Sequence, residues 1–208
     1  MKKYLLAAAL ITGGVCAGTA SQAGTIPYPT PGTINPVVYN FTATATGSVT
    51  GFFFGFNAAD TDEIEMLVNG VASPAGFGFV NQTSAIGSSF NFGNVTAGDT
   101  ITFLLRNQTT STNFSSKPTL NADLDQHIYS TDFAGNATIP AGTYVAFEDL
   151  LASQGSDFDY NDDSFVFTNL ARVTGTPILG ALPLFVSGLG VVGVLAFRRK
   201  RKRESAVA

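Results

Sequence analysis

The chain of 208 residues has almost no cysteine, histidine or tryptophan, and each shortage excludes a class of protein. The single cysteine, Cys16, lies in an apolar N-terminal run, so the rest of the chain forms no disulfide and depends on packing for stability. The single histidine, His127, excludes a zinc site of several histidines, and no G-x-S-x-G motif occurs. Two carboxylates could hydrolyse a glycoside, but the chain has no tryptophan to frame a sugar. We therefore expect no enzymatic activity.

Positive charge is scarce in the middle of the chain. Eight of the 11 lysines and arginines lie either at the N-terminus or in the block Arg198–Arg203, which leaves Arg106, Lys117 and Arg172 for residues 24–177. Fourteen acidic residues lie in the same span, so its net charge is −11. Such a surface repels nucleic acid and anionic lipid headgroups. We therefore expect no nucleic-acid partner.

Residues 1–23 predict a secretory signal peptide. Two lysines precede an apolar run, Tyr4–Val15, that is too short to anchor the chain in a bilayer. The small-x-small triplet Ser21–Ala23 follows at the distance that a signal peptidase needs. We expect cleavage after this triplet and export of the remaining chain, which then contains no thiol.

A second apolar run predicts one transmembrane helix near the C-terminus. Residues 178–197 carry no charge, and a helix of that length would measure about 30 Å, the thickness of the hydrocarbon core. The basic block Arg198–Arg203 follows at once and predicts that this end stays in the cytoplasm while the body lies outside the inner membrane. A buried core helix is the alternative interpretation.

The residues between these two runs are typical of an all-β domain. Threonine, glycine, phenylalanine, asparagine and serine are abundant, and β-branched or aromatic residues alternate with small polar ones. The expected strands are Phe41–Thr50, Gly51–Phe56, Glu63–Val68, Thr100–Arg106, Gln126–Ser130, Gly142–Phe147 and Ser164–Asn169. In the last of them, Phe165 and Phe167 share one face. We predict an antiparallel β-sandwich of the jelly-roll or Greek-key type.

The expected domain organisation follows from these segments. After the signal peptide, residues 24–40 form an extended, proline-containing leader, residues 41–172 the β-sandwich domain, and residues 173–208 a tail that contains the transmembrane segment and the basic stop 198–203. Within the sandwich domain, residues 107–122 are polar and we expect them to form a long loop.

Acidic residues crowd into one stretch of the domain. Between Phe147 and Ser164 the chain reads EDLLASQGSDFDYNDD, with acidic groups at the end of one expected strand and the start of another. A hairpin-like connection would bring the two groups together, and their oxygens are the ligands that a hard cation such as calcium takes. The candidate metal ligands are Glu148, Asp149, Asp157, Asp159, Asn161 and Asp163.

This stretch is not an EF-hand. Its D-x-D-x-N spacing begins like one, but Asp162 stands where the motif needs glycine and Thr168 where it needs glutamate. We expect calcium binding, because a divalent ion would relieve the repulsion between six carboxylates. The alternative is a polar turn whose aspartate and asparagine side chains cap their own backbone.

The C-terminal tail resembles a bacterial sorting signal. The sequence TPILGALPLFVSGLGVVGVLAFRRKRK is similar to the PEP-CTERM signal, in the variant that reads V-P-L-P-A-A-L-P-L-F, then S-G-L-G and a basic end. The matching residues are Pro177, Ala181, Leu182, Pro183, Leu184, Phe185, Ser187, Gly188, Leu189 and Gly190. The tail departs from the variant at Thr176 and Leu179, where valine and proline are usual.

This resemblance implies a Gram-negative envelope protein. It implies an exosortase-type sorting protease as partner, cleavage near Pro177, and passage from an inner-membrane-anchored precursor to the cell surface or the extracellular medium. Exopolysaccharide is a further candidate partner, because bacteria with such tails often make it. The body resembles a secreted β-domain found beside these tails, which has no established activity. Three blocks carry that resemblance: Thr50–Gly70, Ala97–Asn107 and Phe147–Asn169.

The expected function is therefore that of a secreted surface or extracellular-matrix protein. We expect it to be non-enzymatic, stabilised by calcium and sorted through its tail. Two alternatives stay open. One is a calcium-dependent carbohydrate-binding module, and the other is an envelope protein that keeps its tail and stays permanently anchored.

Overall fold

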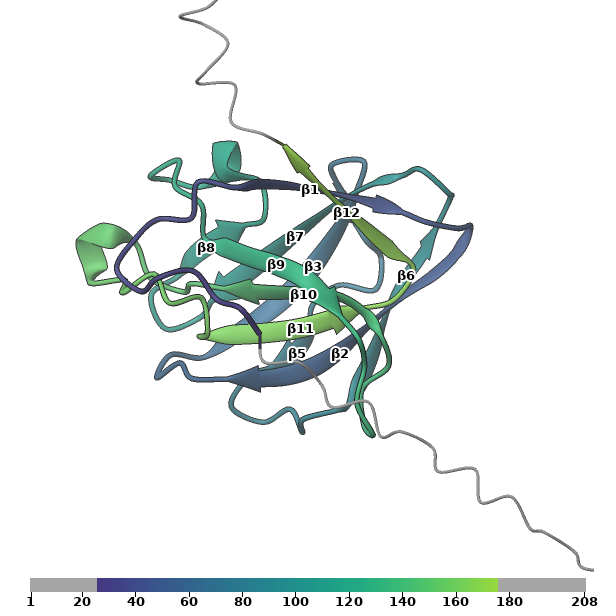
Figure 1. Cartoon of the computed structure of the whole chain (residues 1–208), viewed down its shortest axis with the longest axis horizontal. Coiled ribbons are helices and arrows are strands. Elements are labelled where there is room, and N and C mark those ends of the chain that lie inside the picture. Colours follow the sequence, from purple (N-terminus) through teal and green to yellow (C-terminus); the bar gives the residue numbers. More distant parts are fainter. Residues whose placement is uncertain (1–25, 176–208) are drawn as a thin grey trace, which may run out of the picture.

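The computed structural model describes residues 26–175, which form two antiparallel β-sheets packed face to face (Figure 1). The predicted signal peptide, transmembrane segment and basic stop lie outside the described residues, as does all of the predicted sorting tail beyond Gly175. Within residues 26–175, no helix has the length and apolar character needed to cross a membrane.

Seven strands form the larger sheet. They are β1 Val38–Ala43, β3 Asp62–Val68, β4 Val71–Ala72, β5 Gly78–Val80, β7 Thr100–Asn107, β8 Thr112–Ser115 and β12 Leu170–Gly175. The order is β12-β1-β7-β3-β4, with β5 also beside β3 and β8 also beside β7. The first strand therefore pairs with the last, and Figure 1 shows β1 and β12 side by side.

Five strands form the smaller sheet. They are β2 Gly47–Phe56, β6 Ser89–Val95, β9 Ile128–Phe133, β10 Gly142–Phe147 and β11 Asp163–Phe167, in the order β6-β2-β11-β10-β9. Two single-turn 3-10 helices, η1 Pro118–Leu120 and η2 Ala152–Gln154, are the only helices in the described part of the chain. The expectation of an antiparallel, all-β, sandwich-like body is therefore confirmed.

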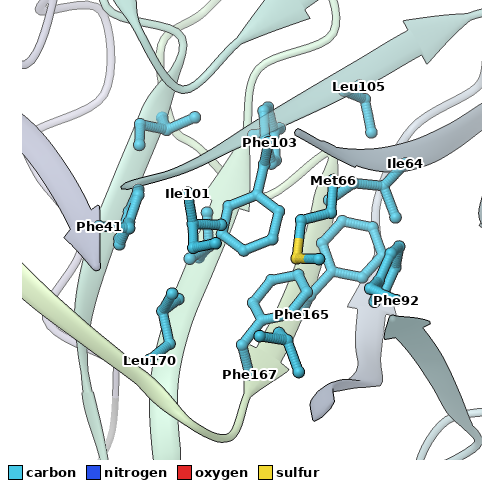
Figure 2. Close-up of a cluster of buried hydrophobic side chains, with 14 of the residues drawn as sticks. Phe41, Ile64, Met66, Phe92, Ile101, Phe103, Leu105, Phe165, Phe167 and Leu170 are labelled. Atoms are coloured by element: carbon cyan, nitrogen blue, oxygen red, sulfur yellow. The ribbon is translucent and has the colours of Figure 1, made fainter. Parts of the chain in front are cut away.

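Aromatic side chains fill the space between the two sheets (Figure 2). Phe103 from β7 stacks on Phe167 from β11, with ring centroids 4.0 Å apart. Phe92 from β6 packs on the same Phe167 ring at 5.7 Å. Gly51 in β2 makes room for these rings, because an added Cβ would lie 2.6 Å from Phe92 and 2.9 Å from Phe167. Since such rings contribute both buried area and ring-to-ring attraction, they stabilise the fold without any disulfide.

A second apolar cluster covers the outer face of the smaller sheet. Its buried members are Phe133, Ile139, Tyr144, Ala146 and Val166. Val166 lies between Phe165 and Phe167, which face the inter-sheet core, so the predicted sharing of one face by these two phenylalanines is confirmed. The leader packs here: Ile26 contacts the cluster, and the Tyr28 and Tyr144 hydroxyls are hydrogen-bonded.

Each of the seven expected strand segments contains a strand, but some boundaries were wrong. The expected strand Phe41–Thr50 is two strands, because the chain turns at residues 44–46 between β1 and β2. The turn is stabilised by Asn169, whose side-chain oxygen accepts a hydrogen bond from the backbone N–H of Ala45 at 2.8 Å.

Strands β4, β5, β6, β8 and β12 were not predicted. The expected loop over residues 107–122 contains both β8 and η1, and Phe114 from β8 is fully buried. Strands β4, β5 and β8 are short, and β6 contains glycine and asparagine, which weakens the alternation on which the prediction depends. Pairing with neighbouring strands stabilises all five: β4 and β5 pair with β3, β6 with β2, β8 with β7, and β12 with β1.

The stacked pair between the sheets generates a stability prediction. Phe167→Ala removes a fully buried ring, so we expect it to lower the free energy of unfolding by about 3–5 kcal/mol. Val71→Ala in β4 is the control, because Val71 is 71% exposed and its truncation should change stability by less than about 0.5 kcal/mol. Urea unfolding of both variants measures the difference. Equal losses would contradict the assignment of Phe167 to the core.

Candidate metal centre

The loop between β10 and β11 carries most of the predicted metal ligands. It begins with Glu148, contains η2 and returns through the acidic stretch to Asp163, the first residue of β11. Gly155 ends η2 in a left-handed conformation, with φ of 97°, which turns the chain back toward the sheet. The two ends of the loop therefore lie together, because β10 and β11 are paired antiparallel neighbours.

Two aromatic residues anchor the acidic stretch to the body. Phe158 and Tyr160 have positive φ values of 48° and 58°, a conformation that is uncommon for residues other than glycine. Both side chains are buried. The Tyr160 hydroxyl donates to the carbonyl of Gln126 at 3.0 Å and accepts the N–H of Asn35 at 2.7 Å. Because these contacts hold the aromatic residues inward, the alternate residues of the stretch are the more exposed ones.

Three predicted ligands come together at this loop. Glu148, Asp157 and Asp159 each offer one carboxylate oxygen, and the three oxygens lie within 4.8 Å of one another. Glu148 is buried, and its Oε1 accepts the N–H of Tyr160 at 2.7 Å while its Oε2 accepts the hydroxyl of Ser156. Asp157 is exposed and Asp159 is half-buried, so the group opens to solvent on one side. These three residues could hold a metal ion.

The pKa values of this triad reflect the crowding. Burial raises the pKa of Glu148 above its usual value, and the charges of Asp157 and Asp159 raise it further. Burial likewise raises the pKa of Asp159, with Asp157 adding to the effect. Without a metal, these two carboxyl groups therefore lose their protons less readily than ordinary ones. A bound cation would favour their ionised forms.

Asn161 lies next to the triad. Its Nδ2 donates to Asp159 Oδ2, its backbone N–H donates to Asp159 Oδ1 at 3.1 Å, and its own Oδ1 is buried without a hydrogen-bond partner among residues 26–175. The N–H of Asp159 donates to Asp157 Oδ1 at 3.3 Å. These are the contacts expected of a self-capping turn, so the loop combines that turn with a group of convergent oxygens.

The two remaining predicted ligands lie elsewhere. Asp149 and Asp163 are buried, and they lie beside the buried Asp62 and the half-buried Asp162. We call these four residues the buried aspartate cluster. Neither belongs to the triad of oxygens. Of the six predicted ligands, the structure therefore brings three together in the triad. Glu148 contacts Ser156 and Tyr160 of the loop, whereas the adjacent Asp149 contacts Asp62 and Asp162.

Asp62 was missed by the sequence analysis, although a signal for it exists. In β3, Ile64 and Met66 face the core, and Asp62 continues the same alternation to the start of the strand. Asp163 continues the inward series of Phe165 and Phe167 in the same way. Both aspartates therefore lie at one end of the space between the sheets rather than on the surface.

The buried aspartate cluster holds several unusually weak acids. Burial is the main cause in each case, and it raises the pKa of Asp62 to about 6, of Asp149 to about 7 and of Asp162 to about 8. The charges of neighbouring carboxylates add to the increase, whereas side-chain hydrogen bonds with Asp163 and Asp149 lower the pKa of Asp62. The pKa of Asp163 is also raised well above its usual range. The ion pairs among residues 26–175 involve Glu63, Asp132 and Asp123, so none neutralises this cluster.

His127 is a core residue. Its ring is fully buried against Phe114, with centroids 4.6 Å apart, and its Nε2 lies 3.0 Å from Asp123 Oδ2. The backbone carbonyl of His127 accepts the N–H of Glu148 at 2.9 Å. The histidine therefore supports the acidic loop through its backbone and does not face the triad as a ligand.

Comparison with known proteins gives no family model that matches the chain, no similar curated protein and no similar solved structure. The resemblance of the tail to a sorting signal depends on residues outside the described part and stays a prediction. The function is therefore inferred from the site and from the two ends of the chain.

The weak acids generate a prediction for the metal-free protein. The folded state binds protons at Asp62, Asp149 and Asp162 more tightly than the unfolded chain, in which an aspartate has a pKa near 3.8. The free energy of unfolding in chelator should therefore fall as pH rises from about 4 to about 8. Because one unit of pKa is worth about 1.4 kcal/mol for one group, the total loss should amount to several kcal/mol.

Urea unfolding in chelator at several pH values measures this loss. Asp162→Asn is the informative variant, since it removes one of these acids and should make the pH dependence shallower. Asp132→Asn is the control, because the Asp132 side chain is 88% exposed and its loss should leave the slope unchanged. A metal-free protein that gains stability with rising pH would contradict the raised pKa values.

Proposed function

We propose that the chain is an exported, non-enzymatic protein of the cell surface or extracellular matrix whose β-sandwich, of the jelly-roll or Greek-key type, is stabilised by calcium. The observation that carries the calcium proposal is the triad Glu148, Asp157 and Asp159, whose oxygens converge within 4.8 Å. The strongly acidic body supports it, because the three cations among residues 24–177 are too few to neutralise fourteen acids.

Calcium fits the triad better than other common metals. All of the converging groups are oxygens, which hard cations prefer, whereas zinc and copper favour histidine and cysteine. Asn161 Oδ1, which is buried without a partner in the described chain, is available as a further oxygen ligand. Calcium accepts six to eight oxygens in flexible geometry, and magnesium demands a strict octahedron. A solvent-open loop with uneven ligands therefore favours calcium.

A cation at the triad would stabilise more than its own loop. The N–H of Gly32 in the leader donates to the carbonyl of Asp157 at 2.5 Å, and the N–H of Asn35 donates to the hydroxyl of Tyr160. Figure 1 shows the leader running past the end of the sandwich that carries η2. The ion would therefore fix the acidic loop and, through these hydrogen bonds, the leader that covers the outer face of the smaller sheet.

The two ends of the chain support export and sorting. The predicted signal peptide directs the chain across the inner membrane, and the tail would hold the precursor there until a sorting protease of the exosortase type cuts near Pro177. Release would place the acidic body at the cell surface or in the extracellular matrix, with exopolysaccharide as a candidate partner. Retention of the tail would instead give a permanently anchored envelope protein.

A groove on the larger sheet supports carbohydrate binding as the second candidate function. Its volume is about 530 Å³, and its lining includes Tyr39, Asn40, Asn69, Thr102, Ser116 and Lys117. Amide and hydroxyl groups of this kind hydrogen-bond sugars.

The groove and the triad have no residue in common, so the groove would bind a sugar without calcium as a ligand. A module that binds glycan through calcium itself is therefore the less favoured alternative.

The triad generates a prediction for thermal stability. If calcium binds only the folded state, it should stabilise the protein by about 2.7 kcal/mol at a hundredfold excess over Kd. The melting temperature should rise with calcium, fall with chelator and respond less to magnesium. Asp159→Asn should reduce the calcium effect by the share that the triad contributes, and Asp132→Asn should keep it in full. Superimposable melting curves with and without millimolar calcium would contradict calcium binding, and the acidic loop would then be interpreted as a self-capping turn alone.

The basic block generates a prediction for sorting. Deletion of residues 198–203 removes the charges that resist translocation, so the protein should be mis-sorted and its C-terminal processing impaired. Cell fractionation locates the protein, and mass spectrometry of the mature C-terminus shows whether residues beyond about 177 are lost. Unchanged location and processing would contradict the sorting proposal, and a wild-type mature chain that keeps its basic end would favour the anchored alternative.

A further inference from the structure

The buried aspartate cluster closes one end of the space between the two sheets. Asp62 lies at the start of β3 in the larger sheet, while Asp149 follows β10 and Asp163 begins β11 in the smaller sheet. All three are at least 97% buried, with exposed fractions of 1%, 3% and 0%. They meet at the edge of the phenylalanine core, where an apolar side chain would be the ordinary choice.

The carboxyl groups of the cluster form a chain of contacts. Asp163 contacts Asp62, Asp62 contacts Asp149, and Asp149 contacts Asp162 through their side chains. Asn81, which is 1% exposed, binds one side of this chain, because its Nδ2 donates to Asp62 Oδ2 at 3.1 Å and to Asp163 Oδ2 at 3.4 Å. The amide therefore orients both carboxylates by binding the Oδ2 atom of each.

The other oxygens of these two carboxylates accept no hydrogen bond from an amide, a hydroxyl or a cationic side chain of the described chain. Asp62 Oδ1 and Asp163 Oδ1 are buried, and neither has a hydrogen-bond partner within residues 26–175. A buried polar atom without a partner destabilises the folded state, and a charged one does so more strongly. Two such oxygens on adjacent carboxylates, oriented by one asparagine, therefore need either protons shared between the carboxyl groups or a bound cation.

No cationic side chain of the described part supplies a partner. Arg106 pairs with Glu63, Arg172 with Asp132, and Lys117 is exposed. Asn107 reaches this end of the sandwich as well, but its Nδ2 donates to Asp60 Oδ2 at 2.8 Å and to the carbonyl of Asp149 at 3.0 Å. The available amides are thus already used, and the unpartnered oxygens remain.

We propose that Asp62, Asp149 and Asp163 hold a second divalent cation of the calcium type, separate from the triad. Asp62 Oδ1 and Asp163 Oδ1 would be ligands, and the carboxylate of Asp149 would complete the acidic set beside Asp62. Asp162 would act as a positioning residue, because its Oδ2 accepts the N–H of Asp149 at 3.0 Å. All of these ligands are oxygens, which suits calcium and excludes a soft metal.

The second ion would join the two sheets. Asp62 belongs to the larger sheet, and Asp163 to the smaller one. In a body without disulfides, a cation between them would act as a cross-link at the end of the core. The first ion, at the triad, would contact only the loop between β10 and β11. The two sites therefore differ in burial, in the segments they connect and in the residues that remove them.

The number of bound calcium ions tests this proposal. The full chain, purified in detergent and stripped with chelator, is equilibrated with calcium, and bound calcium per chain is measured by equilibrium dialysis. We expect two ions in the wild type. Asp163→Asn should reduce the number to one, and Asp159→Asn should also reduce it to one by emptying the other site. The double variant should bind none, and Asp132→Asn should bind two.

The outcomes separate this proposal from the calcium triad. One ion that Asp159→Asn removes and Asp163→Asn retains would overturn the second site and keep the first. One ion that Asp163→Asn removes and Asp159→Asn retains would support the second site and contradict the first. Circular dichroism in chelator shows whether Asp163→Asn folds, and Asp62→Asn replaces it if it does not. The wild type alone can still overturn the proposal: it does so if it binds a single ion and Asp159→Asn abolishes that binding.

Discussion

Phenylalanine rings packed between two antiparallel sheets hold this protein together, since the described body has no cysteine. Both sheets contribute to this core, as the stacking of Phe103 from one sheet on Phe167 from the other shows. The position of the acidic residues depends on this packing. The inward-facing series of β3 and β11 do not stop at the edge of the apolar core but continue to Asp62 and Asp163. The same alternation that buries the rings therefore also buries the carboxylates.

A single loop connects two different acidic environments. Glu148 and Asp149 are adjacent, yet Glu148 joins Asp157 and Asp159 at an opening to solvent while Asp149 contacts Asp62 inside. No lysine or arginine of the described chain pairs with the buried group. Its negative charge must therefore be removed by bound protons or balanced by a bound cation. The outer group can also rely on water. The two groups are therefore expected to respond differently to changes of pH and calcium.

The sequence predicts much of this architecture, and its failures have physical causes. Alternation identified strands such as Gly142–Phe147 to the residue, because the packed faces of the sheets require it. Strand β8 escaped because it has only four residues, and β12 because β1, its pairing partner at the other end of the body, stabilises it. The acidic loop was found from local crowding. Its division into two groups was not, because alternation shows only that Asp62 faces inward, and the packing of the two sheets against each other brings it beside Asp149 and Asp163.

The pairing of the first strand with the last has a kinetic consequence. Strand β1 is completed only when β12 is available, and Asn35 reaches its hydrogen-bond partner Tyr160 across 125 residues of sequence. Contacts between such distant residues form slowly, because a long segment of chain must be ordered before they are gained. A chain of this topology is expected to complete its fold only when nearly all of its body is present. If the chain is exported as proposed, this delay would keep it unfolded while it crosses the membrane.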